Sequence, residues 1–433
     1  MKDGKKIGLA LSGGGYRAAA YHLGTLKKLN QMGILDKVDI ISTVSGGSIT
    51  GAYYCLYGNN FTEFENGLTG ALKSSVVKGV VFSGRFLLII FSILIILTIM
   101  LSLLFTHYAW LSFILLISTI VILLKFQFKI FPVSSIIENL YDKYFFSKKV
   151  LNDLNESPTI AINSTNLETG RPFTFSKNRM NDSKYEYPPD RSNSIYFLQK
   201  EFPISRAVAA SSCVPFAFTP ISIEKKYYVK ESDTKKANPK LVDGGVYDNQ
   251  GIHKITEDSS SYKCDTIIVS DAGNLLPFQS SFKNQVELLI RTSNIFMNRI
   301  KNYQMVINVF ENYRINKMEV AYQSLGWDLQ NCIPGFMSNL KNGAILNSVY
   351  KAHGITDNEI KYKEWDIITN KITANVEYYK ILESAPSNED LLVARRVKTN
   401  LTTLSTIQID ALIKQAACMT ELQVKLYCPS LLK

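Results

Sequence analysis

Three short motifs in the first 250 residues carry groups suited to chemistry. The most pointed is Thr43-Val44-Ser45-Gly46-Gly47, in which a serine follows the apolar run Val38 to Val44 and precedes two glycines. A serine at a sharp strand-to-helix turn is the physical form of a nucleophile elbow, because the turn exposes the hydroxyl beyond the sheet. The usual pattern is G-x-S-x-G, and here Thr43 replaces the first glycine. Since Ser-Gly-Gly also occurs in ordinary turns, the motif alone is a weak indication.

The second motif is a run of glycines, Ser12-Gly13-Gly14-Gly15-Tyr16-Arg17, between an apolar run and a helical pattern. Consecutive glycines expose several backbone N–H groups, and a helix N-terminus adds positive potential. Such a loop suits a phosphate or the oxyanion that develops during acyl transfer. Arg17 either orients this loop, meets a substrate phosphate, or is an ordinary surface residue of the helix.

The same loop also satisfies the dinucleotide pattern G-x-G-x-x-G/A with Gly13, Gly15 and Ala18. Asp36 and Asp39 follow about 20 residues later, where that motif carries a ribose-binding acid. These acids fall before or at the start of the second expected strand, whereas cofactor sites lie at the carboxyl ends of strands. The residue at that carboxyl end is a serine. The pattern therefore favours a nucleophile over a nucleotide site, and no cofactor is expected.

The third motif is Leu241-Val242-Asp243-Gly244-Gly245, in which an aspartate follows a short apolar run and precedes two glycines. Its carboxylate is expected at a strand end with room around it. The competing interpretation is an Asp-Gly turn of a hairpin, which is common and has no function of its own.

Four other titratable groups lie near these motifs. His22 and His253 are each placed to complete a conventional catalytic triad, although a lone histidine is more often structural. Asp248 is a close alternative acid that is more typical of a structural partner, and Asp271 is a further carboxylate at an expected strand end. The six cysteines form no C-x-x-C pair and no cluster with histidine, so neither a metal nor a disulfide scaffold is expected.

The elements that must position these motifs alternate along the chain. Strands are expected over residues 7–11, 38–44, 159–162 and 266–269, helices over 16–33, 48–56, 205–211 and 285–321, and a hairpin over 227–242. Alternation of this kind predicts an α/β fold with a parallel sheet and right-handed crossovers. The final third carries no motif to which chemistry can be assigned.

An uncharged stretch of 39 residues interrupts this pattern between Arg85 and Lys125. As one helix it would be about 58 Å long, well beyond a hydrocarbon core of roughly 30 Å. A break at the polar and aromatic residues 106–110 predicts a helical hairpin over residues 86–105 and 110–128, spanning or re-entrant. The alternative is a very apolar helix pair buried inside a soluble domain.

The charge pattern agrees with a membrane location. The chain of 433 residues has a formal net charge of +11, with its basic pairs scattered and with no recognisable nucleic-acid-binding motif. Lysines and arginines flank the apolar stretch on both sides, which predicts that both flanks are cytoplasmic and face anionic lipid headgroups. The basic N-terminus leads into glycines rather than an apolar run, so a cleaved signal peptide is not expected.

In their order along the chain, the three motifs resemble the patatin-like phospholipase family. The family's signature is a G-G-G-x-R/K loop, a G-x-S-x-G elbow and a later D-G-G/A. The matching segments are Gly13-Gly14-Gly15-Tyr16-Arg17, Ser45-Gly46-Gly47 and Asp243-Gly244-Gly245. The segment from Ser205 to Pro215 resembles the family's Ala/Ser-rich helix ending in proline, and Asp248-Asn249 after the D-G-G also fits. Thr43 is a departure from the elbow pattern.

The resemblance implies a three-layer α/β/α sandwich and a Ser–Asp dyad without histidine. In that mechanism Ser45 attacks an ester carbonyl and Asp243 accepts its proton. The N–H groups of Gly13, Gly14 and Gly15 stabilise the oxyanion. Supporting roles in the elbow and in the D-G-G turn fall to Gly46, Gly47, Gly244 and Gly245. Because an aspartate near its reference pKa of about 3.9 is a poor base, the dyad requires a water-poor site.

The expected organisation is a catalytic domain over residues 5–275, an inserted transmembrane hairpin over 86–128 and a mainly helical C-terminal region over 276–433. The expected activity is that of a membrane-anchored carboxylic ester hydrolase acting on phospholipids or lysophospholipids, with its catalytic domain on the cytoplasmic side. A lipid ester and the bilayer are the expected partners, and nucleic acid is not. The alternatives are a catalytically silent membrane scaffold that binds lipid or protein, and an acyltransferase that uses the same dyad.

Overall fold

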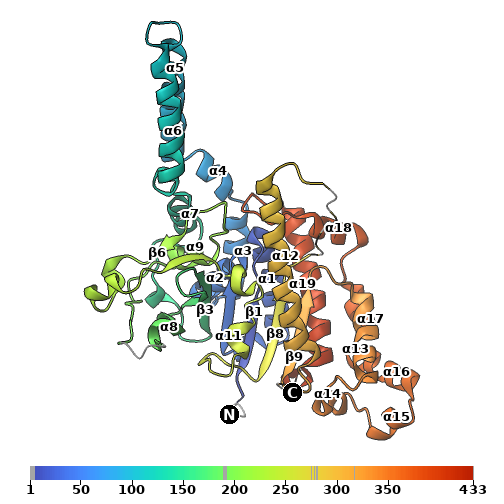
Figure 1. Cartoon of the computed structure of the whole chain (residues 1–433). Coiled ribbons are helices and arrows are strands. Elements are labelled where there is room, and N and C mark those ends of the chain that lie inside the picture. Colours follow the sequence, from blue (N-terminus) through green and yellow to red (C-terminus); the bar gives the residue numbers. More distant parts are fainter. Residues whose placement is uncertain are drawn as a thin grey trace.

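The structure is a computed structural model, and it describes residues 5–188, 193–274, 276, 278, 281–315 and 317–432. At its centre lies a nine-stranded sheet with the order β5-β4-β3-β2-β1-β8-β9, in which β7 pairs with β3 and β6 (Figure 1). The strands are β1 (Ile7–Leu11), β2 (Ile40–Val44), β3 (Thr159–Asn166), β4 (Arg171–Phe175), β5 (Met180–Asp182), β6 (Ile221–Ser222), β7 (Lys240–Asp243), β8 (Thr266–Asp271) and β9 (Glu319–Ser324).

The five central strands, β3-β2-β1-β8-β9, are all parallel to one another. The remaining strands join the sheet antiparallel, beginning with β4 and β7 on β3. The expected α/β fold with a mainly parallel sheet is therefore confirmed. Parallel strands are buried on both faces, which explains why Ile7–Leu11 reads as a continuous apolar run.

Helices cover both faces of this sheet, and alternate strand residues enter two separate hydrophobic cores. Leu9 and Leu11 pack into the core shared with α1 (Gly15–Gln31) and α2 (Gly46–Tyr57). Ala10 points the other way, into the core shared with α11 (His253–Thr256). Two helix layers around one sheet follow directly from the two-residue period of a strand.

The other helices of the first 305 residues are α3 (Phe61–Leu72), α4 (Val76–Val81), α5 (Gly84–Leu103), α6 (Ala109–Ile130), α7 (Val133–Tyr141), α8 (Ser183–Glu186), α9 (Ile204–Ser211), α10 (Gly245–Asp248) and α12 (Gln285–Met305). The C-terminal helices are α13 (Cys332–Lys341), α14 (Asn347–Ala352), α15 (Asp357–Lys361), α16 (Trp365–Asn375), α17 (Tyr378–Glu383), α18 (Asn388–Arg396) and α19 (Thr406–Tyr427).

Two expected elements are wrong. The hairpin expected over 227–242 is absent from the described residues, since β7 pairs with β3 and β6 instead, and 231–235 forms a short 3₁₀ helix. The charged run of this segment lacks the apolar alternation that a strand requires. The helix expected over 285–321 ends early, because Glu319–Ser324 forms β9 and pairs with β8.

The apolar stretch forms two long helices, α5 and α6, which project away from the sheet as a hairpin (Figure 1). Both are long and apolar enough to cross a membrane. The alternative of a buried helix pair is wrong, since large side chains along both arms are exposed, for example Leu88 at 66% and Phe113 at 65%. The Ser112 hydroxyl donates to the Met100 carbonyl across the hairpin, at 2.9 Å.

The C-terminal region contacts the rest of the chain closely. Strand β9 extends the central sheet, and α19 packs along α1, where Gly24 lies against the backbone of Ile413. A separate hydrophobic core joins α13, α16 and α17 to α19. The division of the chain near residue 275 stays a prediction.

Candidate active site

Ser45 lies at the sharp turn between β2 and α2. Its backbone has φ +50° and ψ −117°, a conformation that residues other than glycine rarely adopt. Such a residue costs about 1–3 kcal/mol and persists only where its surroundings hold it. The Ser45 N–H donates to the Ser211 hydroxyl at 2.9 Å, and the Gly47 N–H donates to the Ser12 carbonyl at 3.1 Å. The turn is therefore tied both to α9 and to the glycine loop.

Close packing explains the glycine that follows the serine. A Cβ at Gly46 would overlap the backbone of Gly15, so the elbow and the glycine loop come this close only because position 46 is a glycine. Gly47 and Gly244 meet the same restriction against the backbones of Leu11 and Asn163.

Thr43, the departure from the elbow pattern, is accommodated in the structure. Its methyl group points at Gly51 of α2, where an added Cβ would lie only 2.6 Å from it. Its hydroxyl lies 2.9 Å from that of Ser48, which lies 2.8 Å from that of Ser211. The threonine thus begins a chain of hydroxyl groups that ends at the Ser45 N–H, a connection that gives no signal in the sequence.

Asp243 ends β7 beside the elbow, and the two side chains meet. The Gly245 N–H donates to the Asp243 carboxylate at 2.7 Å. The Ser45 side chain lies close enough to that carboxylate to lower its pKa, and both residues line one cavity. Burial raises the pKa of Asp243 to about 6, and the Gly245 N–H and the Ser45 side chain only partly oppose the shift. The carboxylate is consequently ionised at neutral pH and a stronger base than an exposed aspartate.

All three glycines of the loop line the same cavity, and their N–H groups differ in what they bind. The Gly13 N–H donates to the Asn249 carbonyl at 2.8 Å, so it is already occupied. Within the described part of the chain, the N–H groups of Gly14 and Gly15 have no acceptor. This finding separates Gly13 from the other two in the oxyanion role that the resemblance implies for all three.

Arg17 is held beside the loop rather than at the open surface. One of its terminal nitrogens donates to the Val397 carbonyl at 3.3 Å, and its Nε is buried without a partner. Burial lowers the pKa of Arg17, and the nearby Asp271 carboxylate opposes that shift. The side chain lines the same cavity as Ser45, so both the loop-orienting and the substrate-facing interpretations stay open.

Neither histidine near the motifs is placed as a base for Ser45. His22 is fully buried, with Nε2 donating to the Ser12 carbonyl at 2.9 Å and Nδ1 2.8 Å from the Ser270 hydroxyl. Burial lowers the pKa of His22 to about 4, so its ring is neutral. His253 lies outside the cavity and faces Glu257 at 3.5 Å.

The two other carboxylates have structural partners. Asp248 accepts from the N–H groups of Gln250 and His253, at 2.9 and 2.8 Å. Burial alone would raise the pKa of Asp271, but Lys301 at 2.6 Å and the Tyr322 hydroxyl at 2.7 Å lower it overall. Neither aspartate lines the cavity that contains Ser45.

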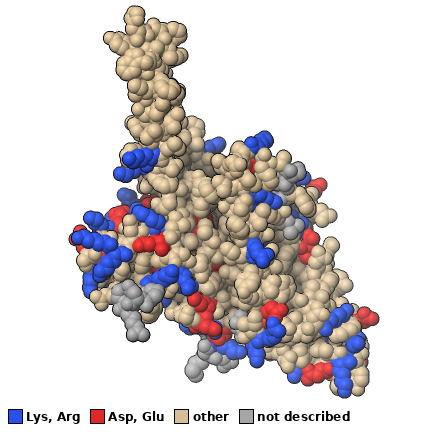
Figure 2. Space-filling model, in the orientation of Figure 1, with Lys and Arg blue, Asp and Glu red and all other residues tan. Residues whose placement is uncertain are grey.

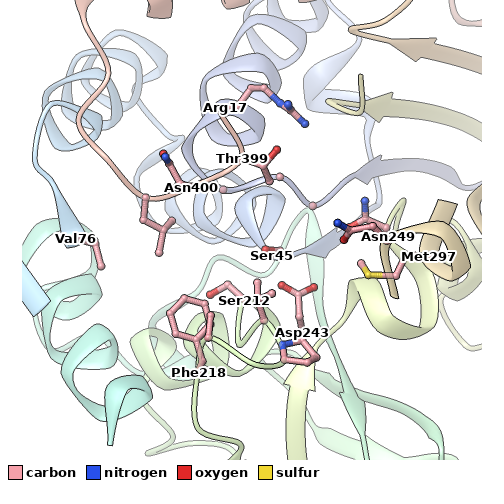
Figure 3. A pocket seen from close by; sticks show the side chains of 18 of the residues that line it. Arg17, Ser45, Val76, Ser212, Phe218, Asp243, Asn249, Met297, Thr399 and Asn400 are labelled. Atoms are coloured by element: carbon pink, nitrogen blue, oxygen red, sulfur yellow. The ribbon is translucent and has the colours of Figure 1, made fainter. Parts of the chain in front are cut away.

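Ser45 and Asp243 open into a cavity of about 690 Å³ with a largely apolar wall, a size typical of small-molecule sites. Figure 3 shows Ser45 between two groups of lining residues, with Val76 and Phe218 on one side and Asn249 and Met297 on the other. Two more lining residues, Thr399 and Asn400, come from the C-terminal region. The Asn400 carbonyl accepts from the Tyr16 N–H at 2.9 Å, so this distant loop braces the glycine loop.

Comparison with known families gives a match to the patatin-like phospholipase model over residues 9–254. Among curated proteins, a putative meiotic phospholipase of Saccharomyces cerevisiae, SPO1, is 44% identical over 48 residues. That match spans 11% of this chain and 8% of the yeast protein.

Matches among solved structures include VipD from Legionella pneumophila, at 14% identity and a TM-score of 0.33, with 98% of this chain and 86% of that chain covered. Human GIVD cytosolic phospholipase A2 in complex with methyl gamma-linolenyl fluorophosphonate is also 14% identical. Its TM-score is 0.44, with 99% of this chain and 59% of that chain covered.

Proposed function

The chain belongs to the patatin-like phospholipase family, and from this premise we propose that it is a serine lipid acyl hydrolase with a Ser45–Asp243 dyad. The observation that carries the proposal is the pair formed by Ser45 and the buried Asp243, which line one cavity and interact closely enough for the serine to affect the raised pKa of the aspartate. It stands at a strained elbow that opens into a mainly apolar cavity. Its substrates are the carboxylic esters of phospholipids or lysophospholipids.

The proposed reaction proceeds through an acyl-enzyme. The Ser45 oxygen attacks the ester carbonyl while its proton passes to Asp243, and the N–H groups of Gly14 and Gly15 donate to the oxyanion. The tetrahedral intermediate collapses, and the departing lipid alkoxide takes the proton from Asp243. A water molecule then attacks the acyl-serine with Asp243 again as base, which releases the fatty acid and restores Ser45.

We also propose that α5 and α6 anchor the enzyme in a membrane. Helix α5 has 20 residues, which at 1.5 Å per residue give about 30 Å, the thickness of a hydrocarbon core. The hydroxyl groups of Ser92, Thr98 and Ser102 donate to carbonyls one turn earlier, as a lipid environment requires. Figure 2 shows no charged residue along the shaft of the hairpin and basic residues at its foot. Basic flanks on both arms favour a cytoplasmic catalytic domain.

Fatty-acid release from mixed phospholipid vesicles tests the proposal. We expect Ser45→Ala and Asp243→Asn to lose about 10³-fold or more in rate, while His253→Ala, outside the cavity, keeps the wild-type rate. Equal release by wild type and Ser45→Ala, or none by either, would favour the silent scaffold. Transfer of the acyl group to an added lysophospholipid in preference to water would favour the acyltransferase.

A further inference from the structure

The cavity beside Ser45 has an apolar end that reaches the foot of the hairpin. Its wall there comes from α4 and α7, the short helices that immediately precede and follow α5 and α6. The lining side chains are all aliphatic, namely Val76, Val77, Val80, Val81, Val133 and Ile137. The insertion that carries the membrane helices therefore also supplies the side of the cavity nearest to them.

The valines of α4 mark an opening rather than a closed wall. Val76 is fully buried, whereas Val77 and Val81 line the cavity and are also 41% and 42% exposed. A side chain that meets both the cavity and the outside lies at a mouth. Phe82, the next residue toward α5, is 71% exposed.

Helix α4 is held at its first turn and against α7. The N–H groups of Val76 and Val77 both donate to the Leu401 carbonyl, at 3.1 and 3.4 Å. Further along, α4 packs on α7 where Gly79 faces the side chain of Leu140. The two helices thus form one continuous wall of the mouth, joined by this close contact.

The surroundings of this mouth match the headgroup level of a bilayer. Because α5 alone spans about 30 Å, its first turn lies at the boundary of the hydrocarbon core, with α4 just outside it. Lys78, Arg85 and Lys129 are exposed around the hairpin foot, where anionic headgroups attract positive charge. Exposed Val77, Val81 and Phe82 at that level have apolar lipid as their natural contact.

We propose that the lipid substrate reaches Ser45 sideways from the bilayer, its acyl chain passing along the aliphatic wall that α4 and α7 form at the foot of the hairpin. The occupant of this passage is the acyl chain of a phospholipid in the leaflet that holds the hairpin foot. The proposal rests on the proposed function and adds the route and the source of the substrate. In this arrangement the ester carbonyl of the substrate lies at Ser45, and its acyl chain lies along the valines of α4.

The test compares two substrates on the full-length protein, vesicles of dioleoyl phosphatidylcholine and dioleoyl phosphatidylserine, and soluble 4-nitrophenyl butyrate. Val80→Trp fills the aliphatic passage, and we expect the ratio of vesicle to butyrate turnover to fall about tenfold or more. The control is Val229→Trp, at an exposed valine away from the cavity. There the ratio should stay within about twofold of wild type.

A second variant guards against misfolding of the first. Val77→Asp changes an exposed residue at the mouth, so the fold tolerates it, and its carboxylate should lower the same ratio by opposing apolar contact. Equal loss on both substrates, or an unchanged ratio in both variants, would overturn the lateral route and leave the hydrolase intact. Retention of both activities in Ser45→Ala would instead refute the proposed function itself.

Discussion

At the scale of single residues, the proposed dyad depends on an aspartate whose charge is costly to bury. Asp243 is 4% exposed, and burial holds its pKa at about 6. A carboxylate in water is too weak a base to accept a serine proton efficiently, whereas a base whose pKa approaches the working pH does so well. The burial of Asp243 therefore makes its carboxylate a stronger base, and it also destabilises the folded protein when that carboxylate is ionised.

The pH dependence of the reaction should report this group. We expect kcat/KM for a soluble ester to fall tenfold per pH unit below an apparent pKa near 6, because protonated Asp243 accepts no proton. Initial-rate assays with the soluble ester at a series of pH values between 4 and 8 measure this dependence. A midpoint near 4, the value of an exposed aspartate, would contradict the buried base.

The stability of Asp243→Asn gives an independent reading of the same shift. The folded pKa lies above the unfolded value of 3.8, so the folded state binds the proton more tightly and loses stability as pH rises from about 4 through 6. Roughly two pKa units correspond to about 3 kcal/mol. We expect the variant to have a higher thermal midpoint at pH 7.5, and the difference to vanish at pH 4. If Asp243→Asn were less stable than the wild type at pH 7.5, burial would not be destabilising the ionised Asp243 carboxylate.

At the scale of elements, the elbow is positioned by contacts from parts of the chain far apart in sequence. The motifs were enough to single out Ser45, Asp243 and the glycine loop, which line one cavity in the structure, because each is a local pattern with a backbone requirement. They were not enough to identify Ser211, which holds the Ser45 N–H from a helix more than 160 residues away. The sequence also gives no indication of the contact from Asn400 to the glycine loop, because this contact is made by a backbone carbonyl, which every residue type has.

The close contact between Thr43 of β2 and Gly51 of α2 can be tested by a pair of substitutions. Gly51→Ala places a methyl group against the Thr43 methyl, and overpacking of this kind costs about 1–3 kcal/mol. Adding Thr43→Ser removes that methyl but keeps the hydroxyl bonded to Ser48, so the double variant should recover most of the loss. Thermal unfolding of the two single variants and the double variant measures the coupling. Strict additivity of the two changes would contradict it.

At the scale of the whole molecule, the secondary structure of the hairpin could be predicted from the sequence more accurately than that of the C-terminal region. Composition alone was enough to predict two apolar helices, expected over 86–105 and 110–128 and found over 84–103 and 109–130. The strand β9 was missed because its sequence continues a helical pattern, and only pairing with β8 selects the strand. Tertiary context decides such segments.

Removal of the hairpin tests its role in presenting substrate. The rings of Phe86 and Phe131 lie 6.4 Å apart, so a short Gly-Ser linker can replace residues 84–130. We expect turnover of a soluble ester to persist while vesicle hydrolysis falls about 10²-fold or more, through loss of effective concentration at the membrane. A hairpin of equal length with its apolar residues shuffled is the matched control and should restore vesicle hydrolysis. Full vesicle activity without the hairpin would contradict the anchor.

The central claim is that Ser45 is the nucleophile and Asp243 its base. An alkyl fluorophosphonate incubated with the full-length protein, followed by mass spectrometry of its peptides, tests this most directly. We expect one adduct on the peptide containing Ser45, formed far more slowly in Asp243→Asn and at the wild-type rate in His253→Ala. An adduct on another serine, or labelling of Ser45 that is indifferent to Asp243→Asn, would contradict it.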